Sequence, residues 1–313
     1  MAKKKYKVTI SYDGTNFYGY QIQPDVRTVQ GEIEKVLATM HHGKRVRIHG
    51  SGRTDSGVHA KGQVFHFSTK LNIPEQNWKQ ALNAQLPDDI HVHEVKRVPK
   101  RFHARFSAAK KEYRYFVLQT EEPNVFLRNY RWMINDRLDV SLIEEACKVF
   151  IGKHDFTAFS SRRSRTKGSK VRTLYNVAVE ENGDELVFIL EGDGFLYHMV
   201  RIIASILVDA GRGLITPDQI EEMFETKDRG IFGRPAPPQG LYLWNVTYHE
   251  RLEKFDWELD DDESDEEDDE DEYDDQADET QDKSEAYEET ASDDAIEENE
   301  NVEKIERKQT RPA

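Results

Sequence analysis

The sequence predicts an α+β fold in which two β-α-β-β-α-β units follow one another and an acidic segment comes last. Three observations predict it. Apolar residues alternate as in a strand at the start of each half, helical spacing follows, and the charge changes sharply near residue 251. This order of elements is that of the ferredoxin-like unit. We expect the two antiparallel sheets either to join or to face each other across a cleft.

In the first half, Tyr6, Val8, Ile10 and Tyr12 alternate with polar residues, which predicts a strand. The same patterns predict the remaining elements of this unit: a helix over 29–40, a strand beginning at Val46, a strand over 64–67, a helix that Pro74 opens, and a strand over 90–95.

The second half repeats the order without visibly repeating the sequence. Its predicted elements are a strand over 113–118, a helix over 142–150, a hairpin of 171–179 with 186–190, a helix over 195–210, a short helix over 217–224 and a strand over 241–248. With a hinge at 99–111, the predicted domains are 1–105 and 106–250, followed by the tail at 251–313.

The charge is divided unevenly between body and tail. Residues 251–313 hold 30 acidic and 7 basic residues, a net charge of −23, whereas residues 1–250 hold 30 acidic and 37 basic residues, a net charge of +7. A segment so acidic and so poor in apolar residues is expected to be disordered. Its expected role is competition with an anionic ligand for the basic body, and a solubility device or a docking site for a basic partner are the alternatives. A basic body favours a polyanionic partner.

The remaining composition favours a cytoplasmic protein. Cys147 is the single cysteine, so the chain has no internal disulfide. No apolar run reaches the roughly 18–20 residues of a membrane span. The first residues carry lysines but lack the apolar stretch of a signal peptide.

The segment His49–Ala60 is the most informative of the chain. It places Arg53, Thr54, Asp55, Ser56 and His59 in a loop with three glycines, immediately before an apolar strand. Glycines let the backbone approach a ligand closely, so the loop favours a site around the Asp55 carboxylate. A glycine-rich turn capped by an Asx motif is the simpler interpretation.

A second candidate residue lies in an apolar helix. Arg201 is the only permanently charged residue of 195–208, and a buried arginine needs a carboxylate or phosphate partner. Asp55 is the attractive partner, and surface exposure of Arg201 or pairing with a structural acid is the alternative. Of two basic segments, 160–170 with five cations favours contact with nucleic acid over a solubilising loop. The segment 102–115, with interleaved aromatic residues, suits phosphate contact and base stacking and equally suits an amphipathic edge strand with solvated charges.

Metal and cofactor motifs are weak. His41, His42, His91 and His93 have no partnering cysteines, and the glycines of 50–57 lack both the spacing of a dinucleotide loop and the lysine of a phosphate-binding loop. We expect neither a metal nor a cofactor.

Several motifs in one order resemble the tRNA pseudouridine synthase A family over about residues 5–250. They are Gln21–Pro24, Thr28–Gly31, Gly52–Ala60 with Gly62–Val64, Phe102–Arg105, Asp155–Phe159, Phe195–Arg201 and Pro237–Leu243. The segment Gly230–Ala236 and the acidic tail depart from the usual pattern of the family.

The resemblance implies a homodimer of two ferredoxin-like halves whose sheets meet at a central catalytic cleft. It implies isomerisation of uridine to pseudouridine in the anticodon stem-loop of tRNA, at tRNA positions 38, 39 and 40, without metal or cofactor. Asp55 is then the catalytic nucleophile. The implied substrate-binding residues are Tyr113 against the target base, Arg53 displacing it from its stack, Arg201 paired with Asp55, Leu241 lining the pocket, and His59.

Two other classes compete with this interpretation. A non-catalytic RNA-binding protein with two RRM-like units is the main alternative, although the aromatic strand motifs of that module are not evident and an aspartate in a basic site would repel phosphate. An aspartate-dependent hydrolase would need a second carboxylate or a histidine base.

Overall fold

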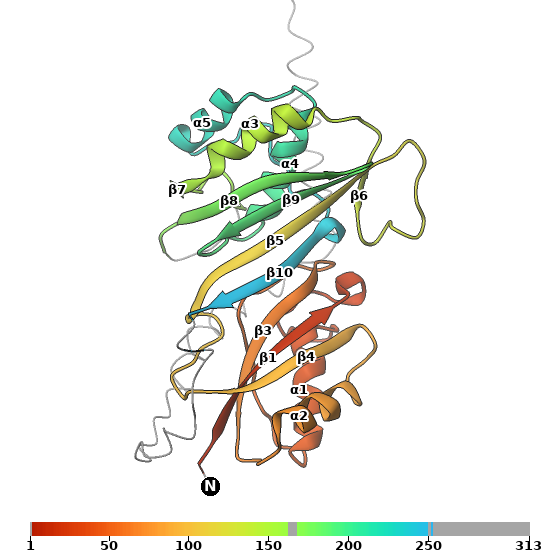
Figure 1. The fold of residues 1–313 in the computed structure, drawn as a ribbon, viewed down its shortest axis with the longest axis vertical. Helices are drawn as coiled ribbons and strands as arrows, with labels where there is room; N and C mark the ends of the chain where they lie inside the picture. Colours follow the sequence, from red (N-terminus) through yellow and green to blue (C-terminus); the bar gives the residue numbers. More distant parts are fainter. Residues whose placement is uncertain (1, 162–167, 250–251, 253–313) are drawn as a thin grey trace, which may run out of the picture. The chain divides into compact units, whose positions relative to one another are not determined.

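The computed structural model describes residues 2–161, 168–249 and 252. All of these residues except 23–26 belong to one compact unit, whose fold is shown in Figure 1. Residues 23–26 form a turn in which Asp25 has a φ of 60°. Among the described residues, no helix is both long and apolar enough to cross a membrane.

The predicted elements occur in the predicted order in both halves, and the second half adds two short strands, Trp132–Ile134 and Gly152–Asp155, that were not predicted. The first half holds β1 (Lys4–Tyr12), α1 (Val29–Met40), β2 (His49–Gly50), β3 (His59–Thr69), α2 (Glu75–Asn83) and β4 (Ile90–Val98). The second half holds β5 (Ala108–Gln119), β6 (Trp132–Ile134), α3 (Val140–Phe150), β7 (Gly152–Asp155), β8 (Val171–Asn182), β9 (Glu185–Gly192), α4 (Met199–Gly211), α5 (Pro217–Thr226) and β10 (Leu241–Tyr248), with short 3₁₀ turns at Gly14–Asn16 and Pro238–Gly240.

The two halves share one strand order and join into a single sheet. The order is β4-β1-β3-β2 in the first half and β10-β5-β9-β8 in the second, with β7 beyond β8 and β6 beside β5. The halves join where Tyr242 and Leu243 of β10 pair in parallel with His59 and Ala60 of β3. Of the two arrangements open from the sequence, the sheets therefore join. The start of β3, directly after the glycine-rich loop, meets the second half there.

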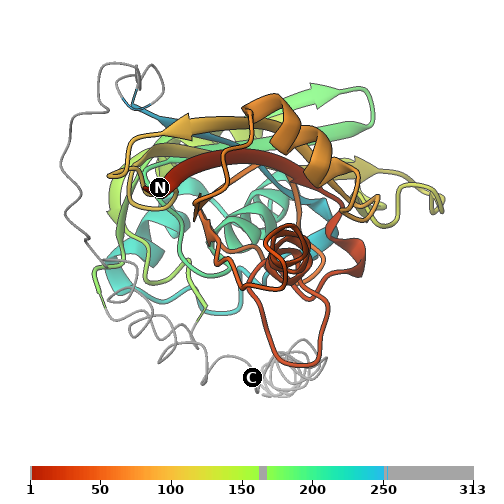
Figure 2. The same ribbon diagram turned by 90° about the horizontal axis from the view of Figure 1, so that it is seen from below.

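The alternating pattern explains the packing of the first half. Tyr6, Val8, Ile10 and Tyr12 of β1 are all buried, as their spacing predicts. Trp78 of α2 packs edge-on against Phe67, with ring centroids 5.2 Å apart. Figure 2 shows α1 and α4 on the same side of the sheet. One apolar core therefore runs through both halves.

Several predicted boundaries are wrong. The strands β3 and β5 each begin five residues before their predicted starts at Val64 and Tyr113. The second strand covers only His49–Gly50, so it begins three residues after Val46. The helix predicted from Phe195 begins at Met199, because His198 adopts the left-handed conformation (φ 60°, ψ 1°), which interrupts a right-handed helix.

Candidate active site

The loop 51–58, which we call the aspartate loop, is fixed to the segment 12–20, which begins with the last residue of β1. The Tyr12 hydroxyl lies 2.7 Å from Oγ1 of Thr54, and the Tyr20 amide donates to the Thr54 carbonyl at 3.0 Å. The Gly57 amide donates to the Phe17 carbonyl at 3.3 Å. These bonds hold the backbone on both sides of Asp55, so its carboxylate is presented by an anchored loop.

Glycine is needed where segment 12–20 meets the aspartate loop. A Cβ on Gly14 would lie 2.0 Å from the Val58 carbonyl oxygen, a distance that no side chain tolerates. Gly19 has a φ of 85°, and its Cβ would lie 2.8 Å from the Thr54 oxygen. The two backbones therefore approach each other more closely than any larger residue would permit.

Arg201 reaches this loop from α4. Its side chain is almost fully buried, and its Nη1 donates to Oδ2 of Asp55 at 3.2 Å, while its Nε donates to the Ala236 carbonyl at 2.6 Å. The Asp55 side chain keeps 20% of its surface exposed. The pair thus combines a fixed buried cation with a carboxylate that a ligand can still reach.

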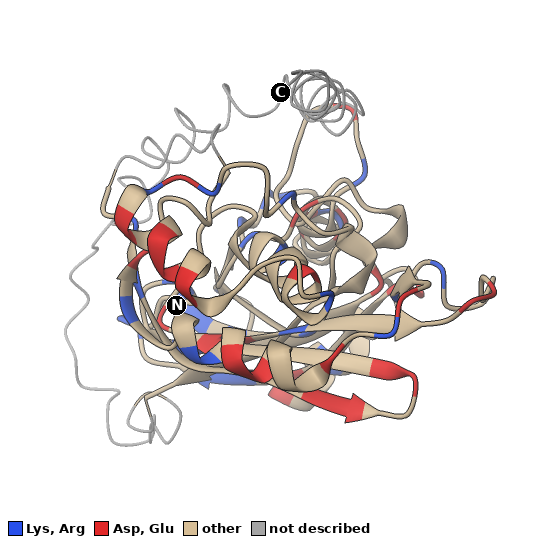
Figure 3. Cartoon of the chain, turned by 90° about the horizontal axis from the view of Figure 1, so that it is seen from above, with Lys and Arg blue, Asp and Glu red and all other residues tan. Residues whose placement is uncertain are grey.

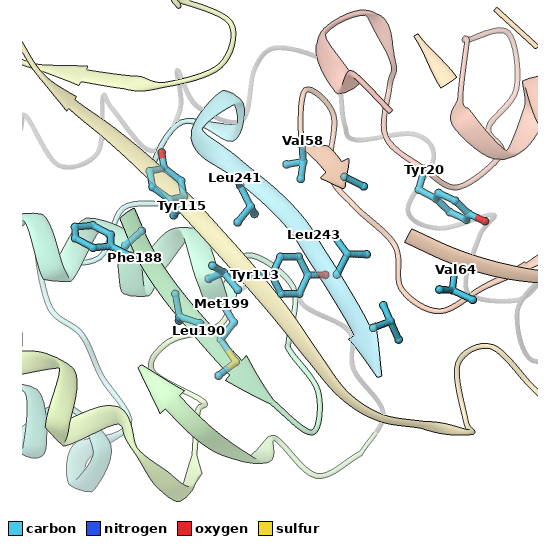
Figure 4. Packing of buried hydrophobic residues seen from close by; sticks show 14 of the residues in the cluster. Tyr20, Val58, Val64, Tyr113, Tyr115, Phe188, Leu190, Met199, Leu241 and Leu243 are labelled. Atoms are coloured by element: carbon cyan, nitrogen blue, oxygen red, sulfur yellow. The ribbon is translucent and has the colours of Figure 1, made fainter. Parts of the chain in front are cut away.

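Tyr113 and Leu241 come from the neighbouring strands β5 and β10. In the antiparallel register Tyr113 lies opposite Leu243, and Tyr115 lies opposite Leu241 (Figure 4). Tyr113 is buried and packs edge-on against Phe195 at 4.9 Å between ring centroids. Burial raises the pKa of Tyr113, and the nearby Tyr12 and Asp55 raise it further, so its hydroxyl stays neutral at neutral pH.

Lys111 stands two residues before Tyr113 on β5 and therefore on the same face of the strand. Its ammonium group donates to the Ser51 carbonyl of the aspartate loop. A Cβ on Gly52 would lie 3.3 Å from Lys111 Nζ and 3.8 Å from the Tyr113 hydroxyl, so both groups face Gly52. Burial, followed by the charges of Arg105 and Arg172, lowers the pKa of Lys111 to about 8.

His59 has contacts other than this cluster, and Arg53 belongs to the aspartate loop itself. Arg53 is exposed at the surface of the loop. His59 is buried, its Nδ1 accepts from the Gly14 amide at 3.0 Å, and its Nε2 lies 2.9 Å from the Asn129 carbonyl. Burial lowers the pKa of His59, so the ring is neutral and Nε2 donates to that carbonyl. Its ring also stacks on Tyr242 with centroids 4.6 Å apart, which ties the start of β3 to β10.

Two residues of the site were missed from the sequence. His198 places Nε2 at 3.5 Å from Oδ2 of Asp55, beside Arg201. Its position three residues before Arg201 was an available signal, because residues three apart share a helix face. Lys111 was missed as well, and its even spacing from Tyr113 on a strand was the signal.

The charges of the described body are mixed rather than uniformly basic. Figure 3 shows acidic and basic residues interspersed over its helices and strands. Within 2–161, 168–249 and 252, no group of three or more His, Cys, Asp or Glu side chains is arranged to hold a metal ion. The basic segment predicted at 160–170 lies partly outside the described residues, since 162–167 are not among them.

Comparison with known proteins places the chain in a family. The family model described as tRNA pseudouridine synthase matches residues 8–107 and 146–249. The tRNA pseudouridine synthase A of Oceanobacillus iheyensis is 53% identical over 247 residues, which are 79% of this chain and 98% of that protein. That of Bacillus subtilis is 54% identical over 243 residues, which are 77% of this chain and 98% of that protein. The chain therefore belongs to the tRNA pseudouridine synthase A family.

Proposed function

We propose that the protein isomerises uridine to pseudouridine in the anticodon stem-loop of tRNA, at tRNA positions 38, 39 and 40, with Asp55 as the nucleophile. Membership of the family makes the chain an isomerase that forms pseudouridine in tRNA. The proposal adds the modified site and the roles of the residues. The observation that carries it is the Asp55 carboxylate held by Arg201 at 3.2 Å, on an anchored loop that is still partly exposed.

The reaction needs one well-placed nucleophile and no external reagent. The C1′–N1 glycosidic bond breaks, the base turns, and a C1′–C5 bond forms. One proton leaves C5 and one is gained at N1, so substrate and product have the same composition. A carboxylate that attacks the base or the sugar carbon divides this change into two easier steps. Asp55 supplies that carboxylate whether it attacks the base or the sugar carbon.

Arg201 orients the nucleophile. Its charge-assisted hydrogen bond fixes Oδ2 of Asp55, and its own position is fixed by the Ala236 carbonyl. With one carboxylate oxygen held in place, the other is directed toward the substrate. Orientation of this kind lowers the barrier because less freedom is lost at the transition state.

Tyr113 and Leu241 supply the walls for the target base. A uridine within a stem must leave its stack, which costs a few kcal/mol, and an aromatic ring can offset that cost by stacking on the base. Tyr113 is already fixed by Phe195, so its ring is preorganised. Apolar side chains such as Leu241 exclude water that would otherwise hydrolyse the broken glycosidic bond.

Cations beside the site suit an RNA backbone. Arg105 and Arg172 lie near enough to Lys111 to lower its pKa, and Arg53 is exposed on the aspartate loop. Phosphate contacts of this kind supply affinity without reading sequence. In the proposal Arg53 takes the space of the displaced base.

The test uses unmodified tRNA transcript, full-length protein and mapping of pseudouridine by carbodiimide modification. We expect new pseudouridines in the anticodon stem-loop with wild-type protein and none with Asp55→Asn. The matched control is Asp184→Asn, an exposed aspartate of the β8–β9 hairpin, which should act as wild type. Modification only outside the anticodon arm would contradict the proposed site, and RNA binding without any conversion would favour the non-catalytic alternative.

The remaining proposals concern assembly and surroundings. We propose a homodimer in the cytoplasm, from the resemblance and the single cysteine, and sedimentation at several concentrations tests the dimer. We also propose a basic partner for the acidic residues 251–313, most of which lie outside the described residues. Truncation after Leu259 should leave the rate of conversion unchanged while abolishing capture of such a partner.

A further inference from the structure

His198 touches the catalytic carboxylate but has no part in the proposed function so far. Its Nε2 lies 3.5 Å from Oδ2 of Asp55, the same oxygen that accepts from Arg201 at 3.2 Å. A carboxylate oxygen can only accept, so the nitrogen that faces it favourably carries a hydrogen. The two side chains thus converge on one oxygen of Asp55 from α4 and from the residue preceding it.

The backbone at His198 is held in an unusual conformation. His198 has a φ of 60° and a ψ of 1°, in the left-handed region that few residues other than glycine adopt. In the described chain three other non-glycine residues share a positive φ, namely Asp25, His42 and Lys227. Left-handed residues persist where the surrounding structure requires them, and they gather at functional sites.

A neighbouring ring fixes the imidazole. The rings of Tyr197 and His198 stack with centroids 3.9 Å apart and an interplanar angle of 27°. The His198 side chain is about as accessible as that of Asp55, at 20% for each. The imidazole is therefore fixed by its backbone and by Tyr197, and it stays as accessible as the carboxylate it contacts.

We propose that His198 is a positioning residue for Asp55. Together with Arg201 it holds Oδ2 and so turns Oδ1 toward the substrate. This inference rests on the proposed role of Asp55 as nucleophile. Arg201 alone can hold the oxygen along one direction only, and the carboxylate can still rotate about that bond. A second donor at the same oxygen restricts that rotation, which is the freedom that preorganisation must remove.

Three substitutions separate the donor from the backbone. His198→Leu keeps bulk and removes the N–H group, His198→Gln keeps an N–H donor at similar reach, and His198→Gly removes the ring while accepting the positive φ without strain. His42→Leu is the matched control, because His42 is an exposed histidine with a φ of 55°. Thermal unfolding of every variant reports whether the fold is retained.

The measurement is single-turnover conversion of unmodified tRNA transcript, together with the Kd for the same transcript. We expect His198→Leu and His198→Gly to slow conversion by about ten- to a hundredfold, the range that follows when a carboxylate loses a polar N–H neighbour. We expect His198→Gln to recover to within about fivefold of wild type, as a neutral donor is retained. Kd should stay within about twofold for all variants, since phosphate contacts dominate affinity.

Either of two results overturns the inference. Conversion by His198→Leu or by His198→Gly at the wild-type rate would show that the donor is not needed. A Gln variant as slow as the Leu variant would show that the N–H contact is not what matters. Both results leave the proposed function intact as long as wild type converts uridine and Asp55→Asn does not. A folded His198→Gly variant keeps the test decisive if His198→Leu fails to fold.

Discussion

Arg201 Nη1 lies 3.2 Å from Asp55 Oδ2, although the two residues are 146 positions apart in the chain. The same guanidinium donates through Nε to the Ala236 carbonyl at 2.6 Å, and the Arg201 carbonyl accepts from the Ala236 amide at 3.1 Å. One side chain therefore connects the aspartate loop, α4 and the segment that leads into β10. A substitution at Arg201 should therefore perturb all three of these segments.

We expect Arg201→Met to slow conversion by about a hundredfold or more. Breaking a buried ion pair costs at least about 3 kcal/mol, and a transition state destabilised by that amount is reached about a hundredfold more slowly. Arg201→Lys should recover only part, since lysine lacks the planar fork that reaches Asp55 and Ala236 together. Arg212→Met, at the end of the same helix, is the control. A lysine variant with full activity would mean that Arg201 serves as a simple charge.

Tyr113 should act through its ring more than through its hydroxyl. Tyr113→Phe keeps the edge-on contact with Phe195 and should retain far more activity than Tyr113→Ala, which loses the stacking surface. Single-turnover rates on one tRNA transcript compare the two variants. Equal and complete loss in both would assign the hydroxyl a part in proton transfer.

Gly14→Ala should destabilise the protein because the new Cβ would meet the Val58 carbonyl at 2.0 Å. Relief requires a backbone shift in the aspartate loop, and overpacking of this kind costs about 1–3 kcal/mol. Urea unfolding measures the loss. Gly168→Ala is the control, since nothing lies within 4 Å of a Cβ there and its φ is not positive. Equal midpoints for the two variants would show that the loop is not held against Gly14.

Stability should fall in mild acid because of His66. Burial, with Lys5, His49 and His103 adding to it, lowers the pKa of His66 from 6.5 to about 2. Between these values the unfolded chain binds a proton that the folded chain does not bind. The free energy of unfolding should therefore decrease as the pH falls below 6.5, by at most about 1.4 kcal/mol per pH unit from this residue.

His66→Asn tests this contribution while keeping an acceptor for the Ala104 amide, which donates to Nδ1 of His66 at 3.1 Å. The variant should lose stability less steeply between pH 6.5 and pH 4 in urea titrations. His59, whose pKa burial also lowers, adds a slope of the same sign that the variant keeps. Identical slopes for wild type and variant would exclude His66 as a source.

Local patterns were enough to predict most elements of the fold. The alternation from Tyr6 to Tyr12 is typical of a strand with one face on the core, and the apolar run after Met199 is typical of a buried helix. Two of the boundary errors have local causes. His198 turns left-handed where the apolar pattern continues, and Val46 and Ile48 are buried without pairing as a strand. Buried loop residues and paired strand residues are both apolar, so the sequence pattern alone does not distinguish them.

Long-range geometry was beyond the sequence. The parallel pairing of His59 and Ala60 with β10 depends on a register between segments more than 180 residues apart. The anchoring of the aspartate loop by Gly14 and Gly19 likewise depends on close packing of two distant backbones. A lone charge in an apolar helix was visible, so Arg201 could be predicted, whereas His198 was marked only by its spacing three residues before Arg201.

The central claim is that the Asp55 carboxylate performs the chemistry and not the binding. The most direct measurement compares wild type, Asp55→Asn and Asp184→Asn on one unmodified tRNA transcript, with Kd and single-turnover pseudouridine formation measured side by side. We predict that Asp55→Asn binds within a few-fold of wild type, because phosphate contacts dominate affinity, and forms no pseudouridine. Conversion by Asp55→Asn above about one hundredth of the wild-type rate would contradict the account, since an amide cannot replace a carboxylate nucleophile.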